Sequence, residues 1–256
     1  MIKLIATDMD GTFLGTEGKM PERAFEVINK LYDNGIMFVA ASGRPLHSLK
    51  EIFAPVKDKI LFVARNGSMV YTSTEELLLK TLHNELVDKI IKFSDNGITH
   101  PVICSKKAHY IFPRATRFFD RINFYLGDLK GITSIEEIVR PVISISVLVE
   151  DASQTENICQ EIITLFEDQS TIVQTGKEWI DIVPKHCNKK EGLQLFMNKL
   201  NISEDEVMAF GDYHNDIDML LLAGESYAMT HAVDEVKKVA KYQCKPSDIL
   251  RIMESI

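Results

Sequence analysis

The sequence lacks several features that would place it in a specialised class of protein. None of its four cysteines stands in a Cys-x-x-Cys pair, so neither a disulfide framework nor a zinc site is predicted, and the thiols fit a reduced, intracellular protein. No block of lysines or arginines runs along the chain, and the net charge is −8, so no nucleic-acid surface is expected. Repeats and low-complexity linkers are also missing.

Long apolar runs are equally scarce. No stretch approaches the roughly 18–20 apolar residues that a helix needs to cross a bilayer, so no membrane association is expected. The opening residues, MIKLIATDMD, meet a charge before the core of a signal peptide could form, which favours a cytoplasmic protein. Because acidic residues outnumber basic ones by 37 to 29, an anionic substrate would need local positive charge from a metal ion, lysine or arginine.

What the sequence does contain is an alternation of short apolar runs and amphipathic segments. The runs IKLIAT, IMFVAAS and ILFVA are each long enough for one buried strand. Between the first two, apolar residues of 24–31 recur at helical spacing, with Pro21 suited to the first turn and Gly35 to the helix end. A second helix is expected over 46–53. This β-α-β-α-β order predicts the α/β class, with a Rossmann-like parallel sheet covered by helices.

The pattern changes after the third run and resumes near the end of the chain. The stretch SMVYTSTEELLLKTL predicts a hairpin that leads away from the sheet. Residues 83–185 then mix helices with the strand-like runs HPVICS, VISISVLVE, STIVQT and WIDIVP, enough for a separate α/β module of about 100 residues. We therefore expect a core domain of 1–82 and 186–256, interrupted by an inserted domain of 83–185.

Polar motifs follow the predicted strands or open helices at four places: DMDGT, ASGR, NKKEG and GDYHND. In an open parallel sheet, ligands bind beyond the carboxyl ends of the strands, where the strand order reverses. Asp8 and Asp10 lie two residues apart and would point to the same side of an extended chain. Like charges held there repel unless a cation lies beside them, and carboxylate oxygens suit Mg²⁺.

Two further carboxylates, Asp212 and Asp216, flank Asn215 after a later strand. A lone aspartate before a helix is most often a cap or turn residue, but four at the ends of two strands favour a metal site.

Candidate anion-binding residues accompany these carboxylates. Ser42 and Gly43 offer a hydroxyl and backbone amides, although Ser-Gly is also an ordinary turn pair. Lys189 opens a helix against the helix dipole, which makes sense if its ammonium binds an anion. Arg44 and Lys190 are expected to be surface charges.

In this order, the four motifs resemble those of the haloacid dehalogenase (HAD) superfamily of phosphotransferases. The inserted module between the second and third motifs resembles the α/β cap (type IIB) of the Cof-type sugar-phosphate phosphatases. RNGSMVY and WIDIVPKHCNKKEGL are also similar to segments of that subfamily. The resemblance covers nearly the whole chain and implies a HAD-like core with a cap that chooses the substrate.

The resemblance also implies a role for each matching residue. Asp8 would be the nucleophile that forms an aspartyl-phosphate, and Asp10 would be the general acid and base. The phosphate would be bound by Met9, Ser42, Gly43, Lys189 and Asn215. Mg²⁺ would be held by Asp8, the main-chain carbonyl of Asp10, Asp212 and Asp216. Lys190 stands where relatives often have glycine, so Lys189 and Lys190 are both candidates for the lysine that binds the phosphate. The register with DIVPK favours Lys189.

The expected activity is therefore Mg²⁺-dependent hydrolysis of small phosphorylated metabolites, sugar phosphates first among them, by a monomer or dimer. Three alternatives stay open: a phosphatase of a vitamin-derived or disaccharide phosphate, a phosphomutase, and a non-catalytic phosphate-responsive regulatory protein. Asp10 favours a hydrolase over a regulator, which only needs to hold a phosphoryl group. The polar candidates for substrate contact in the insert are His109, Tyr110, Arg114 and Arg117. Most of them are expected to be solvated loop residues.

Overall fold

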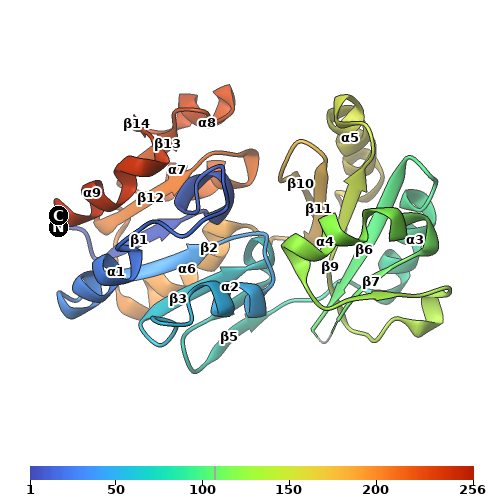
Figure 1. Cartoon of the computed structure of the whole chain (residues 1–256), viewed down its shortest axis with the longest axis horizontal. Coiled ribbons are helices and arrows are strands. Elements are labelled where there is room, and N and C mark those ends of the chain that lie inside the picture. Colours follow the sequence, from blue (N-terminus) through green and yellow to red (C-terminus); the bar gives the residue numbers. More distant parts are fainter. Residues whose placement is uncertain (107) are drawn as a thin grey trace. The chain divides into compact units, whose positions relative to one another are not determined.

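The computed structural model describes residues 1–106 and 108–256, which form two compact units (Figure 1). The core unit consists of Met1–Leu78 and Asn188–Ile256, and the inserted unit is Leu79–Cys187. The expected insert of 83–185 falls inside the second unit. Its part in choosing a substrate stays a prediction.

The core unit is built on a sheet with the strand order β14-β13-β12-β1-β2-β3-β4-β5. The strands are β1 (Leu4–Thr7), β2 (Met37–Ala41), β3 (Ile60–Ala64), β4 (Met69–Tyr71), β5 (Glu76–Leu79), β12 (Val207–Gly211), β13 (Glu225–Met229) and β14 (Tyr242–Cys244). From β14 to β3 all neighbours are parallel, which confirms the predicted α/β class. The chain proceeds outward from β1 on one side and from β12 on the other, so the strand order reverses between these two strands.

Helices cover both faces of this sheet (Figure 1). They are α1 (Ala24–Asp33), α2 (Leu46–Ile52), α6 (Lys189–Leu200), α7 (Ile217–Leu222), α8 (Asp234–Val239) and α9 (Ile249–Glu254). Helix α1 packs beside α9, and α6 packs beside α7. Strands β1 and β3 are buried along their whole length, as expected of strands covered on both faces.

Two local expectations for the core unit are wrong. The predicted hairpin does not leave the sheet, because β4 pairs antiparallel with β3 and extends it. Strand β3 would otherwise present an unpaired edge, and the tight turn η2 (Arg65–Gly67) returns the chain to that edge. Helix α1 begins at Ala24 after the left-handed residue Arg23, so Pro21 lies before the helix and not in its first turn.

The inserted unit has its own sheet, with the order β10-β11-β9-β6-β7-β8. Its elements are α3 (Asn84–Ser94), β6 (Thr99–Ser105), β7 (His109–Ile111), α4 (Phe119–Leu126), β8 (Leu129–Gly131), β9 (Val142–Val149), α5 (Thr155–Phe166), β10 (Ser170–Gln174) and β11 (Trp179–Pro184). Neighbouring strands are antiparallel except β7 and β8. One apolar cluster joins the sheet to α3 and α5, and a second joins it to α4.

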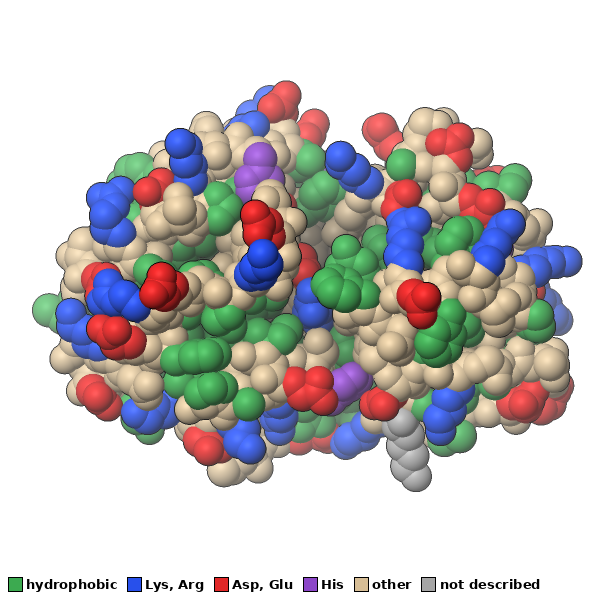
Figure 2. Space-filling model, in the orientation of Figure 1, with side chains coloured by type: hydrophobic (Ala, Val, Ile, Leu, Met, Phe, Trp, Pro, Cys, Tyr) green, Lys and Arg blue, Asp and Glu red, His purple; other side chains and the backbone are tan. Residues whose placement is uncertain are grey.

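Two surface properties bear on partners. Within the described residues, no helix is both long and apolar enough to cross a membrane. On the face drawn in Figure 2, side chains of both charge signs are interspersed, and no continuous basic patch gathers there.

Candidate active site

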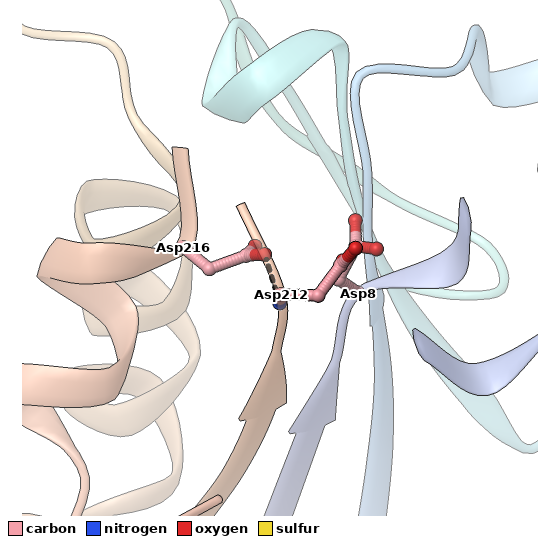
Figure 3. Close-up of side chains that lie close together, drawn as sticks. All are labelled: Asp8, Asp212 and Asp216. Atoms are coloured by element: carbon pink, nitrogen blue, oxygen red, sulfur yellow. Dashed lines mark hydrogen bonds between the residues drawn. The ribbon is translucent and has the colours of Figure 1, made fainter. Parts of the chain in front are cut away.

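Three carboxylates meet at the point where the strand order of the core sheet reverses. Asp8 follows β1 and Asp212 follows β12, and these strands are hydrogen-bonded neighbours. Asp216 ends the short helix η7 (His214–Asp216) that precedes α7. One oxygen from each of the three side chains lies within 4.8 Å of the others (Figure 3). Asp8 is 6% exposed and Asp216 is fully buried.

The ammonium group of Lys189 lies among these carboxylates. Its Nζ donates to Asp8 Oδ1 and to Asp216 Oδ1, both at 2.6 Å, and the side chain is fully buried. The side chain of Asn188 caps α6, which places Lys189 at the first helical position. Gly192 allows α6 to approach the sheet, because a Cβ there would lie 2.5 Å from Val63 Cγ1. The structure therefore brings Lys189 into the carboxylate cluster.

Burial makes this cluster electrostatically unusual. It raises the pKa of Asp8 despite the opposing charge of Lys189, and it raises the pKa of Asp212 to about 7, with Asp216 adding repulsion. Burial alone would lower the pKa of Lys189, but Asp216 and Asp8 outweigh it and hold that pKa above its usual value.

The three carboxylates of the cluster, when ionised, carry two negative charges more than the single ammonium offsets. A divalent cation with oxygen ligands would remove that excess, so these side chains could hold a divalent metal ion.

Asp10 does not join the carboxylate cluster. It lies in the short helix η1 (Met9–Phe13), and its two oxygens accept hydrogen bonds from Arg44 Nε at 2.8 Å and Nη2 at 2.6 Å. The expectation that Arg44 is a surface charge is wrong, because it is only 9% exposed. Strands β1 and β2 are neighbours, so the loops after them meet, and Arg44 finds Asp10 there. A ligand role for the Asp10 main-chain carbonyl stays a prediction.

The expected phosphate-binding residues lie in the loops at the same end of the sheet. Met9 is buried at the start of η1. Ser42 is buried directly after β2, where its Oγ accepts from Arg44 N at 3.1 Å, and Gly43 lies in the bend before α2. Asn215 lies in η7. Their binding of a phosphate stays a prediction.

Some residues beside the cluster were not singled out from the sequence. Thr12 donates to Asp212 Oδ1 at 2.9 Å, and His231 Nε2 lies 3.6 Å from Asp212 Oδ2. Asn66 Oδ1 accepts from Asn215 Nδ2 at 3.0 Å. Thr12 belongs to the motif DMDGT and Asn66 to an Asn-Gly turn signal, so a sequence motif points to each of them. No motif points to His231.

The polar candidates of the inserted unit divide into two pairs. His109 and Tyr110 are each 3% exposed, so the solvated reading is wrong for them. They belong to β7, which lies between β6 and β8 in the sheet. Arg114 and Arg117 are exposed, and they bond to the Asp95 carbonyl and to the Glu150 carboxylate.

Comparison with known proteins adds independent findings. A family model described as haloacid dehalogenase-like hydrolase matches residues 5–249. A 5-amino-6-(5-phospho-D-ribitylamino)uracil phosphatase of Escherichia coli K12, YbjI, is 29% identical over 255 residues, covering 94% of this chain and 90% of the relative. YitU of Bacillus subtilis 168 carries the same activity name and is 26% identical over 252 residues, covering 93% and 90%.

A solved structure agrees over the full length. The crystal structure of SMU.1108c from Streptococcus mutans UA159 superposes with a TM-score of 0.92 at 28% identity. The match covers 100% of this chain and 98% of that one.

Proposed function

This chain belongs to the haloacid dehalogenase-like hydrolase family and is a phosphatase, and we propose that it hydrolyses small phosphorylated metabolites with Mg²⁺ through an aspartyl-phosphate on Asp8. One observation carries the proposal: the carboxylates of Asp8, Asp212 and Asp216 lie together at the carboxyl end of the sheet, and the buried Lys189 ammonium bonds to two of them, Asp8 and Asp216. Phosphoryl transfer needs positioning and neutralisation of charge above all, and this cluster offers both.

The proposed reaction has two steps. A carboxylate oxygen of Asp8 attacks phosphorus, the bond to the leaving alcohol breaks, and the alcohol takes a proton from Asp10. Water then attacks the phosphorus of the aspartyl-phosphate and gives a proton to Asp10. The bond between phosphorus and the Asp8 oxygen breaks, so phosphate is released and the Asp8 carboxylate is restored. Arg44 donates to both Asp10 oxygens and so orients the ionised form of this carboxyl group, which takes the proton from water in the second step.

The remaining residues of the site bind the metal ion and the phosphoryl group and neutralise their charges. The metal ion would be held by the Asp8, Asp212 and Asp216 carboxylates and the Asp10 carbonyl, and when bound it neutralises charge on the phosphoryl group. The phosphoryl oxygens are bound by Lys189, Ser42, Asn215 and the amides of Met9 and Gly43. Because Lys189 pairs with Asp8 and Asp216 in the structure, it reaches the reacting carboxylate without any rearrangement of α6.

Two substrate classes compete. Sugar phosphates fit the resemblance to the Cof-type phosphatases. A second candidate is 5-amino-6-(5-phospho-D-ribitylamino)uracil, because two bacterial relatives that each span nearly this whole chain bear its name.

Phosphate release from a panel of esters tests the proposal. The panel contains sugar phosphates, the ribitylaminouracil phosphate and p-nitrophenyl phosphate, each assayed with Mg²⁺ and with EDTA. We expect Mg²⁺-dependent release that disappears in Asp8→Asn and persists in Asp58→Asn, a matched change at an exposed aspartate. A folded protein that releases phosphate equally well in EDTA, or with Asn at position 8, would contradict the mechanism.

A further inference from the structure

The turn after β3 has an unusual backbone. Arg65, Asn66 and Gly67 all have positive φ angles, of 49°, 50° and 89°. Left-handed backbone is costly for residues other than glycine, and asparagine tolerates it best among them. Consecutive residues in this region persist only when the surrounding structure holds them, and such strain gathers at functional sites.

Backbone hydrogen bonds join this turn to the loop after β2. The Asn66 amide donates to the Ser42 carbonyl at 3.1 Å, and the Arg65 amide donates to the Arg44 carbonyl at 3.1 Å. The turn therefore fixes the backbone on both sides of Gly43, which belongs to the proposed phosphate-binding loop.

The Asn66 side chain reaches a second loop. Its Oδ1 accepts a hydrogen bond from Asn215 Nδ2 at 3.0 Å, and Asn66 is only 2% exposed. The amide group of Asn215 can rotate about its side-chain bonds, so this bond fixes which of its atoms remain for a phosphoryl group.

Gly67 touches a third loop. A Cβ on Gly67 would lie 2.1 Å from the Asn188 carbonyl oxygen, so only glycine fits there. Asn188 caps α6 and precedes Lys189, and the turn packs directly against α6. A shift of Asn188 would therefore move Lys189 away from Asp8.

We propose that Arg65–Gly67 is a positioning segment that holds the phosphoryl-binding loops in register, with Asn66 acting through Asn215. It contacts the loops that carry Ser42 and Asn215 and the start of α6, where Lys189 lies, and these three parts come together from distant places in the sequence. The inference rests on the proposed function, because it assumes that these residues bind the phosphoryl group.

A double-mutant cycle tests whether Asn66 acts through Asn215. Asn66→Gly keeps the left-handed backbone and removes only the carboxamide. We expect it to raise the KM for p-nitrophenyl phosphate and the inhibition constant of inorganic phosphate by about tenfold, with a smaller change in kcat. In an Asn215→Ala background, Asn66→Gly should cause no further rise in either constant.

The outcomes separate the inference from the proposed function. Equal fold-changes in both backgrounds, or an unchanged KM in Asn66→Gly, would overturn the positioning role. A wild-type protein without Mg²⁺-dependent phosphate release would instead overturn the proposed function. A loss of melting temperature with unchanged kinetic constants would show that the turn is only structural.

A glycine pair gives an independent test. Gly67→Ala and Gly35→Ala both place a side chain on left-handed backbone of the core unit, with φ of 89° and 78°, but only the first meets a neighbour within 4 Å. We expect both to lower the melting temperature and only Gly67→Ala to weaken inhibition by phosphate. Equal phosphate inhibition in the two variants would overturn the role of Gly67, and if Gly67→Ala does not fold, the double-mutant cycle decides.

Discussion

The two units treat charged side chains in opposite ways. In the core unit, the carboxylates of Asp8, Asp212 and Asp216 lie together, and the one buried ammonium, on Lys189, pairs with Asp8 and Asp216 and leaves negative charge in excess. In the inserted unit, charged residues form pairs of opposite sign, such as Arg117 with Glu150 and Arg140 with Asp88. The difference follows from strand direction. Parallel strands all end at one edge of a sheet, whereas neighbouring antiparallel strands end at opposite edges and disperse the residues that follow them.

This contrast means that substitutions in the two units should differ in kind. Changes in the core cluster should affect every substrate, because all phosphate esters share the reacting group. Changes to the ion pairs of the inserted unit should have small effects on stability and none on the chemical step.

The largest expected effect is on turnover by Asp10→Asn. Asparagine cannot give a proton to the leaving alcohol or take one from water, so kcat should fall about 10²- to 10⁴-fold for every alkyl phosphate. Mg²⁺ affinity, measured by calorimetry, should change little because the proposed ligand is the main-chain carbonyl. Normal turnover in Asp10→Asn would show that the acid and base role lies elsewhere.

Next in size is the stability change caused by Lys189→Met. Removing the ammonium leaves Asp8 and Asp216 buried without their cation, which should cost about 3–5 kcal/mol in urea unfolding without divalent ions. Mg²⁺ should restore part of the loss. The neighbouring change Lys190→Met is the control and should cost less than about 0.5 kcal/mol. Equal losses in the two variants would show that the pairing of Lys189 does not matter to stability.

A third effect is the dependence of stability on pH. The pKa of Asp212 is raised from 3.8 to about 7, so the folded protein binds more protons than the unfolded chain between these pH values. Stability in EDTA should therefore fall as the pH rises from about 4 to about 7, and Asp8 acts in the same direction. Scanning calorimetry should show that the melting temperature falls by several degrees over this pH range. The fall should be smaller with Mg²⁺ and in Asp212→Asn. A melting temperature that rises over this range would contradict the raised pKa.

The smallest expected effect is in the inserted unit. The side chain of Arg117 is 57% exposed and its partner Glu150 is 32% exposed, so solvent screens the pair. Arg117→Met should shift the melting temperature by no more than about 2 °C and leave kcat for p-nitrophenyl phosphate unchanged. A loss of stability as large as that of Lys189→Met would show that ion pairs in the two units do not differ in their contribution to stability.

Much of the fold could be predicted because its signals are local. Apolar runs such as ILFVA became β3 (Ile60–Ala64), and the helix that Lys189 was expected to open became α6 (Lys189–Leu200). Elements without strong periodicity were missed or misplaced: β14 has only three residues, and the chain before α1 turns through a left-handed arginine that no local pattern announces. The hairpin was assigned to the wrong place because sequence does not show which sheet edge is free.

The sequence by itself determined the α/β class and the residue types that follow each strand, since both depend on composition and short-range spacing. Only the tertiary structure decided which side chains of the site pair with one another. Arg44 meets Asp10, Asn66 meets Asn215 and Lys189 meets Asp8 across 34, 149 and 181 residues of chain. Such pairs arise because a parallel sheet brings distant strand ends to one edge, and no property of either residue alone encodes that meeting.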